Sequence, residues 1–319
     1  MILMPKTKPK ISIDRREIVL AVLFILALYV LIPQFSSFHD SWRLLRHLNT
    51  TWTAFAVYLI LTTYLFAALT YYLLALYRLK YFEVVIVQFA ATAVNRLLPA
   101  GVGALGANYA YLRNRQHNRT QAASVVTVNN LFGLLGHSLI VLFIFLLSSN
   151  DNRHLIINSE HGFSVAVKLF FVLAIILIFL GFVFSSKRLK RGFTNLRKQL
   201  VAYRQRPGRL IGALLSSMAL TLCNVFCLYS CMNAVGIHLP ILIVLIIFTF
   251  GLSTGTVTPT PGGLGGFEAG LVAGFVAFHV SSGSALAIAL LFRLISYWLA
   301  LLIGLFAFVN TQRNHLFGT

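Results

Sequence analysis

The stretch TPTPGGLGGFEAG, residues 258–270, decides how the rest of the sequence is interpreted. It lies inside a long apolar region, residues 239–279, yet it carries two prolines, five glycines and a glutamate. A proline removes a backbone hydrogen-bond donor and disfavours the helical conformation of the residue before it. We therefore expect two short helices joined by a break, with an acidic side chain just after the break.

The composition around this break is typical of a helical membrane protein. Of the 319 residues, 58% are hydrophobic and only 10% are charged, whereas soluble domains carry about 25% charged residues. Several runs exceed about 18 residues without a charge, which is long enough to cross a hydrocarbon core of roughly 30 Å. The sequence therefore predicts an all-α, polytopic membrane protein.

Six full transmembrane spans are expected, near residues 18–33, 52–77, 121–147, 165–184, 210–235 and 284–309. Two further apolar regions, 82–112 and 239–279, are interrupted at their centres by proline and glycine. Each is predicted to form a re-entrant hairpin of two short helices that returns to the side from which it entered. Residues 1–17 are expected to form a basic tail, and residues 18–319 a single integral membrane domain. Because no small-residue cleavage site follows the first apolar run, we expect that run to be retained as a helix.

A net charge of +19 could suggest a nucleic-acid partner, but the distribution of the basic residues indicates an orientation in the membrane instead. Nine of the 26 basic residues lie in one segment, residues 185–209, as in a cytoplasmic loop beside anionic lipid headgroups. Recognition of headgroups by this loop is the alternative interpretation. With a cytoplasmic N-terminus, the cytoplasmic segments hold 20 Lys and Arg residues and the opposite side holds four. We therefore expect both termini to be cytoplasmic. The expected location is a plasma membrane, with a bacterial inner membrane as the preferred case.

The two interrupted regions resemble each other at a fixed distance along the chain. NRLLPAGVGALGANY (95–109) and TVTPTPGGLGGFEAGL (256–271) align at an offset of 162 residues, which places Pro99 on Pro261. The same offset carries the predicted span 52–77 onto 214–239 and the span 121–147 onto 283–309. Chance similarity between Gly/Pro motifs is the alternative explanation.

This correspondence predicts an inverted-topology repeat, the arrangement of many transporters with a binding site near the membrane midplane. Repeat 1 extends over about 52–147 and repeat 2 over about 210–309. The span 165–184 and the basic cytoplasmic loop 185–209 link the two copies, so that their hairpins enter from opposite sides.

A helix broken inside a membrane leaves backbone groups that are costly unless protein or a wet cavity satisfies them. Threonine hydroxyls near the second break can bond to such groups, and glycines let another backbone or a headgroup come close. The second arm of each hairpin begins a helix near mid-membrane, where its N–H groups and positive dipole end favour an anion such as a lipid phosphate. A purely structural hairpin, which lets helices pack tightly, is the alternative.

Three ionisable residues are expected at membrane depth: Arg96 at the first break, Glu268 after the second and Arg293 in the last span. Each charge costs about 2.5–3.5 kcal/mol on insertion scales, so such residues indicate function. We expect Glu268 to pair with Arg293, and the three charges together leave one positive charge, which suits an anion. A purely structural ion pair is the alternative, and a small shift would let Arg96 snorkel to the surface. The full set predicted for substrate binding or gating is Arg96, Pro99, Gly101, Gly103, Thr258, Thr260, Pro261, Gly262, Gly263, Gly265, Glu268 and Arg293.

Motifs of soluble catalysis are missing from the sequence: it has no phosphate-binding loop, nucleophile–base arrangement, zinc-ligand spacing or dinucleotide fingerprint. We therefore expect no enzyme activity, no cofactor and no metal site. His137 and Asn224 lie inside predicted spans and are expected to form hydrogen bonds between helices. A proton-carrying role for His137 is the alternative.

Three segments resemble a known family: PTPGGLGGFEAGL (259–271), LLFRLISYWLALLIGL (290–305) and NRLLPAGVGALGANYAYLRNR (95–115). They are similar to the lysylphosphatidylglycerol synthase transmembrane region family, a flippase-like domain, over roughly residues 15–310. The resemblance implies that the family glutamate corresponds to Glu268 and the late arginine to Arg293. The chain departs from the family pattern at Phe267, where a charged residue is common, and at Ala104 and Gly106, where an acidic residue is common.

The bifunctional members of this family move an aminoacylated phospholipid between leaflets, and a C-terminal soluble domain makes that lipid. This sequence ends shortly after its last predicted span, so aminoacyltransferase activity is not expected. We expect a lipid translocase whose partners are membrane lipids, either an anionic phospholipid or a polyprenyl-linked lipid. The alternatives are a proton-coupled transporter of a small solute or anion, and a non-transporting membrane partner of a lipid-modifying enzyme.

Overall fold

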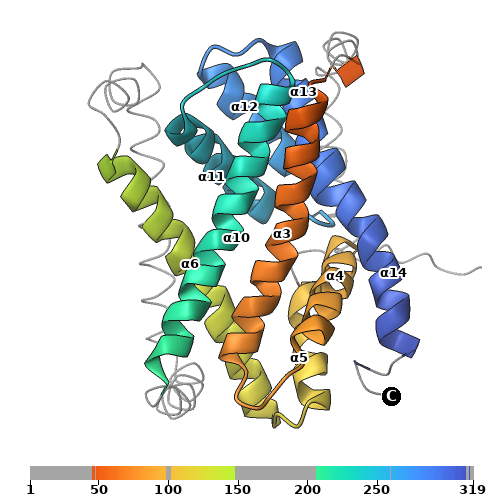
Figure 1. The fold of residues 1–319 in the computed structure, drawn as a ribbon. Helices are drawn as coiled ribbons and strands as arrows, with labels where there is room; N and C mark the ends of the chain where they lie inside the picture. The colour runs from red at the N-terminus through yellow and green to blue at the C-terminus, as the bar shows by residue number, and fades with distance from the viewer. Residues whose placement is uncertain are drawn as a thin grey trace, which may run out of the picture.

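The computed structural model describes residues 45–46, 48–97, 102–147, 206–258, 260–313 and 316. In these residues the chain is helical, with short turns between the helices (Figure 1). The tail 1–17, the predicted spans 18–33 and 165–184, and most of the basic loop 185–209 lie outside the described residues.

The first half contains α3 (Thr50–Leu74), α4 (Tyr81–Leu97), α5 (Val102–Asn114) and α6 (Arg119–Leu147). The start of α3 is fixed by Asn49, whose Oδ1 accepts hydrogen bonds from the N–H groups of Thr51 and Trp52 at 3.0 and 3.2 Å. Such a cap satisfies backbone donors that the first turn of a helix leaves free. The helices α4 and α5 are the two short helices expected within residues 82–112.

The second half contains α10 (Pro207–Ala234), α11 (Ile241–Val257), α12 (Gly266–Ala277), α13 (Ser282–Arg293), the π-helical turn η2 (Leu294–Leu299) and α14 (Ala300–Arg313). Pro207 opens α10 in the first turn, where its missing N–H costs no helical hydrogen bond. Because α13, η2 and α14 follow one another directly, they form one long apolar helix. The helices α11 and α12 lie on either side of the break in residues 258–270, as expected.

Four helices of the described residues are long and apolar enough to cross a membrane: Thr50–Leu74, Arg119–Phe143, Pro207–Ala234 and Ser282–Thr311. The helices α11 and α12 are also apolar but shorter. The chain is therefore an all-helical, multi-pass membrane protein. The two other expected spans fall on residues that the structure does not describe.

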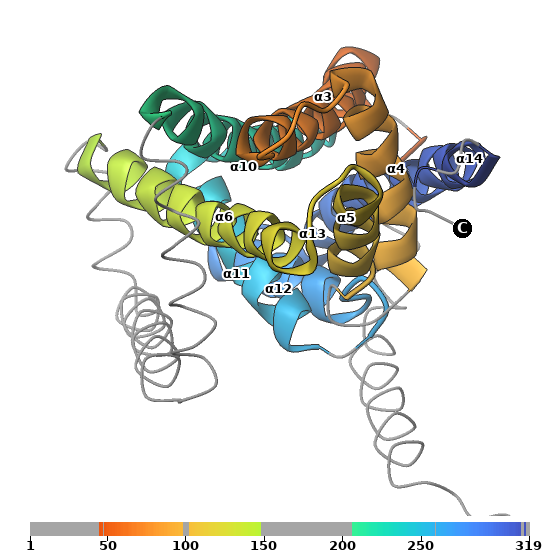
Figure 2. The same ribbon diagram turned by 90° about the horizontal axis from the view of Figure 1, so that it is seen from below.

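The two halves of the chain run in opposite directions. In Figure 1, α3 descends and α10 rises, and the two helices pack against each other. The hairpin α4–α5 occupies the lower half of the bundle, and the hairpin α11–α12 occupies the upper half (Figure 1). Seen from below, α3 and α10 lie on one side of the bundle and α11 and α12 on the opposite side (Figure 2).

The helix bounds follow the spacing noticed in the sequence. Adding 162 to the bounds of α4 gives 243–259, against 241–257 for α11. Adding 162 to the bounds of α5 gives 264–276, against 266–277 for α12. The two hairpins therefore correspond in length as well as in position along the chain.

Two groups of buried apolar side chains hold the bundle together. The larger joins α3 and α10 to α11, α12 and α13, and includes Leu228, Ile247, Leu271, Phe275 and Ile288. The smaller joins α3, α4, α5 and α6, and includes Tyr71, Leu74, Val84, Leu112 and Val125. Since lipid tails are as apolar as these side chains, close van der Waals packing rather than removal from water stabilises such clusters in a bilayer.

Two glycines let other helices approach α4 closely, one in α5 and one in α14. A Cβ atom at Gly103 of α5 would lie 2.5 Å from the carbonyl oxygen of Val94 and 2.7 Å from the Cα of Asn95, both in α4. A Cβ atom at Gly304 of α14 would lie 2.5 Å from the carbonyl oxygen of Phe89 in α4. These contacts are with backbone, which cannot move aside like a flexible side chain, so both positions require glycine for this packing.

His117 joins two turns at one end of the bundle. Its Nδ1 donates to the carbonyl oxygens of Arg115 and Leu112, at 2.9 and 3.2 Å, and its Nε2 accepts from the N–H of Leu76 at 3.2 Å. This set of partners fits the neutral imidazole with its proton on Nδ1. Burial lowers the pKa of His117 below its usual value, although hydrogen bonds to the two carbonyl groups oppose that shift.

Candidate functional site

The break of the second hairpin contains three glycines with positive φ angles. Gly262, Gly263 and Gly265 have φ angles of +60°, +68° and +84°, a region that residues with a side chain rarely adopt. The three glycines reverse the chain between the end of α11 and the start of α12. Close packing also constrains the turn, because a Cβ atom at Gly263 would lie 2.7 Å from the carbonyl oxygen of Gly255.

Threonine hydroxyls satisfy carbonyl groups on both sides of this turn. Thr258 donates from Oγ1 to the carbonyl oxygen of Thr254 at 2.7 Å, and Thr260 donates to that of Leu264, also at 2.7 Å. These are the bonds expected of threonines beside a broken helix in a membrane. In the structure, Thr258 and Thr260 therefore support the turn.

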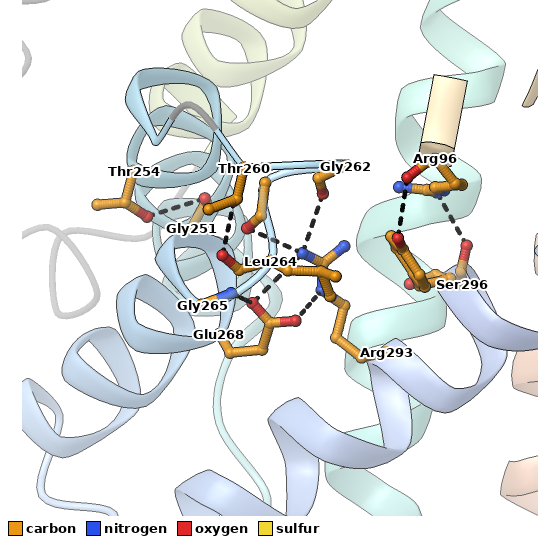
Figure 3. A network of polar contacts seen from close by, with 12 residues as sticks. Arg96, Gly251, Thr254, Thr260, Gly262, Leu264, Gly265, Glu268, Arg293 and Ser296 are labelled. Atoms are coloured by element: carbon orange, nitrogen blue, oxygen red, sulfur yellow. Dashed lines mark hydrogen bonds and ion pairs between the residues drawn. The ribbon is translucent and has the colours of Figure 1, made fainter. Parts of the chain in front are cut away.

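Glu268 and Arg293 form the expected ion pair. Arg293 Nε donates to Glu268 Oε1 at 2.6 Å, and Nη2 donates to Oε2 at 3.3 Å (Figure 3). The two side chains are only 6% and 11% exposed for Arg293 and Glu268. Arg293 Nη2 also donates to the carbonyl oxygens of Gly262 and Gly263 at 3.2 and 3.1 Å. The arginine therefore ties the last long helix to the turn of the second hairpin.

The start of α12 is occupied by the glutamate of that helix. The N–H of Gly265 donates to Glu268 Oε2 at 2.8 Å, so the carboxylate sits where the helix end favours a negative charge. The first hairpin has a comparable cap, since Asn95 Oδ1 accepts from the N–H of Ala104 near the start of α5, at 3.3 Å. Side-chain oxygens thus take up N–H groups that we expected to be free for an external anion.

Arg96, in the last turn of α4, reaches across to η2. Its Nη2 donates to the carbonyl oxygen of Ser296 at 2.9 Å (Figure 3). The hydroxyl of Tyr297 donates to the carbonyl oxygen of Arg96 at 3.1 Å. Arg96 Nε is buried and has no hydrogen-bond partner among the residues that the structure describes. The guanidinium therefore has unused donor capacity inside the protein.

Tyr297 lies between the two arginines. The guanidinium carbons of Arg96 and Arg293 are 4.8 and 5.2 Å from the centre of its ring, within the range of cation–π contacts. A Cβ atom at Gly262 would lie 2.5 Å from Tyr297 Cε2 and 3.3 Å from Arg96 Cδ. The ends of the two hairpins therefore meet at this tyrosine.

Tyr297 and Ser296 are not among the site residues predicted from the sequence. Tyr297 follows Arg293 by four residues, a spacing that brings two side chains to one face of a helix, and this was the available signal. Both residues belong to η2, and π-helical turns inside α-helices occur often at functional sites.

Arg96 forms no ion pair with an acidic side chain in the described part of the chain. The chain has seven Asp and Glu residues, and those within the described ranges are Glu83 and Glu268. Glu83 pairs with Arg115 and Lys80, at 2.6 and 3.4 Å. Glu268 pairs with Arg293. Within the described part of the chain, Arg96 therefore has no carboxylate partner, and the two arginines and one glutamate of the site leave one positive charge.

The remaining predicted site residues differ in their placement. Pro261 is exposed at the turn of the second hairpin, and Gly103 packs inside the first hairpin. Pro99 and Gly101 lie outside the described residues. His137 and Thr249 share a hydrogen bond of 3.1 Å between α6 and α11, as expected. Asn224 instead donates to the carbonyl oxygen of Leu220 in its own helix, so the expectation of a bond to another helix is not met there.

No group of three or more His, Cys, Asp or Glu side chains suited to a metal ion occurs among the described residues. The polar groups that converge at the hairpin ends are instead two guanidiniums, a carboxylate, a phenol and backbone groups. Such a set can bind an anionic group through charge-assisted hydrogen bonds.

The fold and this site define a class: multi-pass helical membrane proteins with buried charges where two short hairpins meet. A comparison with known families matches residues 18–304 to the family described as Lysylphosphatidylglycerol synthase TM region. Since the match covers most of the 319 residues, the chain belongs to this family, as the sequence motifs had indicated. A comparison with curated proteins gave no match.

Proposed function

We propose that the protein is a lipid translocase that moves a lipid with an anionic headgroup between the leaflets of a membrane. The observation that carries this proposal is Arg96, which lies at the meeting point of the hairpins without a carboxylate partner among the described residues. Arg96 is partly exposed, but its Nε is buried. A cation held at membrane depth without a counter-ion is costly, and an anionic ligand group would supply one. Membership of a family named after a lipid-modifying synthase is consistent with a lipid substrate.

The arrangement of the hairpins supports alternating access to this site. They lie in opposite halves of the bundle (Figure 1) and correspond at the 162-residue offset. We interpret them as re-entrant hairpins of an inverted repeat, within a domain of six full spans. In such transporters the site is exposed in turn to each side when one repeat moves against the other. The headgroup would pass between the hairpin ends while its acyl or polyprenyl chains stay in the bilayer.

The distribution of basic residues supports an orientation. At the lower end of the bundle in Figure 1, the turns and helix ends carry eight basic residues: Arg78, Lys80, Arg113, Arg115, Arg119, Arg206, Arg209 and Arg313. The upper end carries Arg46 among the described residues. By the positive-inside rule, we assign the lower end to the cytoplasm of a plasma membrane, with both termini on that side.

Reconstitution of the full chain in proteoliposomes tests the proposal. Fluorescent phosphatidylglycerol placed in one leaflet should move to the other, and Arg96→Gln should reduce the rate at least about tenfold, because a tenfold change needs only about 1.4 kcal/mol. Arg119→Gln, which removes an exposed arginine at the start of α6, is the matched control and should leave the rate unchanged. The proposal includes no catalytic step and no cofactor.

Three outcomes of this experiment would contradict the proposal. Equal rates for the wild type and Arg96→Gln, with both variants folded, would remove Arg96 from any role in transport. Uptake of a water-soluble anion without lipid movement would indicate a solute transporter. Absence of both activities in folded protein would indicate a non-transporting membrane partner of another enzyme.

A further inference from the structure

We propose that Glu268 is a built-in competitor for the anion site, which holds Arg293 until the phosphate of a headgroup bound at Arg96 replaces it. This inference rests on the proposed function and concerns the same site. It assigns the ligand as a phosphodiester with a single negative charge, the group found in phosphatidylglycerol.

The first step of the reasoning is the position of the Glu268 carboxylate. It accepts hydrogen bonds from Arg293 Nε and Nη2 and from the N–H of Gly265, at 2.6, 3.3 and 2.8 Å. A guanidinium fork together with a helix N-terminus is also a preferred environment for a phosphate group. The glutamate therefore occupies the guanidinium fork of Arg293, which an anionic ligand could take when the ion pair opens.

The second step concerns the guanidinium groups of Arg96 and Arg293 as hydrogen-bond donors to a ligand. Arg96 Nε is buried without a partner among the described residues. The hydrogen bonds of Arg293 in Figure 3 come from Nε and Nη2 of its guanidinium. Tyr297 lies against both guanidiniums. A phosphate that enters between the hairpin ends can therefore meet Arg96 first and then reach Arg293.

The third step concerns the hydrogen bonds that Glu268 and Arg293 keep when their ion pair opens. Without Arg293 the carboxylate keeps the N–H of Gly265, and without Glu268 the arginine keeps the carbonyl oxygens of Gly262 and Gly263. Each partner therefore has contacts that remain when the pair opens. No bond is made or broken in this exchange other than hydrogen bonds and ion-pair contacts.

The charge balance then limits the ligand. Two arginines and Glu268 leave one positive charge, which one phosphodiester neutralises. Translocation also requires that the ligand leave the site after it has entered, so binding must not be too tight. Return of Glu268 to Arg293 would favour that release, and two arginines without a competing carboxylate would retain the anion.

Equilibrium binding to the purified full chain tests this inference. Titrations by calorimetry would use short-chain phosphatidylglycerol, zwitterionic phosphatidylcholine of equal chain length and inorganic phosphate as separate probes. We expect Glu268→Gln to bind short-chain phosphatidylglycerol at least about tenfold tighter than the wild type, since the competing charge is removed. Glu83→Gln removes the other described carboxylate, far from the site in its own pair with Arg115, and should leave affinity unchanged.

The outcomes separate this inference from the proposed function. If Glu268→Gln binds equally or more weakly while Arg96→Gln still abolishes binding, the competitor role is wrong and the lipid site stands. If the wild type binds phosphatidylglycerol no better than phosphatidylcholine, and Arg96→Gln changes nothing, the proposed function itself fails. Inorganic phosphate that binds as tightly as the lipid would overturn the assignment of a lipid ligand.

A second variant covers the case in which Glu268→Gln does not fold. Glu268→Asp keeps the charge but is one methylene shorter, so it cannot hold Arg293 and the N–H of Gly265 with the same geometry. We expect it to raise the affinity for short-chain phosphatidylglycerol in the same direction, by a smaller factor. An unchanged or lower affinity of Glu268→Asp would contradict the inference.

Discussion

Replacing Arg293 by methionine should destabilise the protein strongly, because it leaves a buried carboxylate without its counter-ion. The side chains of the pair are 6% and 11% exposed and their closest atoms are 2.6 Å apart. Loss of one partner from such a pair costs about 3–5 kcal/mol. At about 2–4 °C per kcal/mol for domains of comparable size, the midpoint of thermal unfolding in detergent should fall by about 6–20 °C.

The double variant Arg293→Met/Glu268→Met separates stability from function. Apolar residues of similar volume often replace a buried ion pair without loss of stability, so the double variant should recover at least about 2 kcal/mol relative to Arg293→Met. It should nevertheless translocate lipid more slowly than the wild type, because Arg96 remains but the second guanidinium that could bind the headgroup is gone. A loss below about 1 kcal/mol for Arg293→Met, or additive effects in the double variant, would refute the view that the pair is buried and coupled.

Three further predictions test other contacts. Gly103→Ala should lower the free energy of unfolding by about 1–3 kcal/mol, because its Cβ would lie 2.5 Å from a backbone oxygen. The control Gly106→Ala, whose Cβ would have nothing within 4 Å, should be neutral or stabilising by up to about 1 kcal/mol. Equal unfolding midpoints of the two variants would contradict this prediction. Tyr297→Phe should lower the free energy of unfolding by about 0.5–1.5 kcal/mol, because it loses one hydrogen bond. Tyr297→Leu should cost at least about 1 kcal/mol more, because it also loses the ring contacts with two arginines. Identical unfolding midpoints of the two variants would be inconsistent with a cation–π role. Because the folded state lowers the pKa of His117, the unfolded chain takes up a proton first as the pH falls below about 6.5, so stability should decline from there toward the lowered pKa. In unfolding curves measured between about pH 7.5 and 5.5, His117→Asn should lack the loss of stability that comes from His117. A variant with the same pH dependence as the wild type would exclude a contribution of His117.

Local signals in the sequence were sufficient for the helices that the structure describes and for one ion pair. Proline and glycine in an apolar region predicted the breaks around Gly262 and the short helices on either side. The Glu268–Arg293 pair followed from the cost of charges at membrane depth, which leaves few partners to choose from. The same cost gave Arg96 its place among the candidate residues.

The tertiary contacts of the first hairpin could not be derived in this way. Tyr297 meets Arg96 across 201 residues of sequence, and no spacing rule connects positions so far apart. Asn95 as a cap for α5 was also missed, because a cap that comes from the preceding helix depends on how the two arms pack. The helix end of α12, predicted to be free for an anion, is capped by Glu268, so one carboxylate both pairs with Arg293 and satisfies the backbone.

Native mass spectrometry of the purified protein would test the central claim most directly, that the hairpin ends bind one anionic lipid headgroup through Arg96. The wild type should retain a phosphate-bearing anionic lipid from the membrane, at one molecule per chain. Arg96→Gln should lose that lipid, and Arg119→Gln should keep it. Equal retention by Arg96→Gln and the wild type, or a wild type that retains only zwitterionic lipid, would contradict the account.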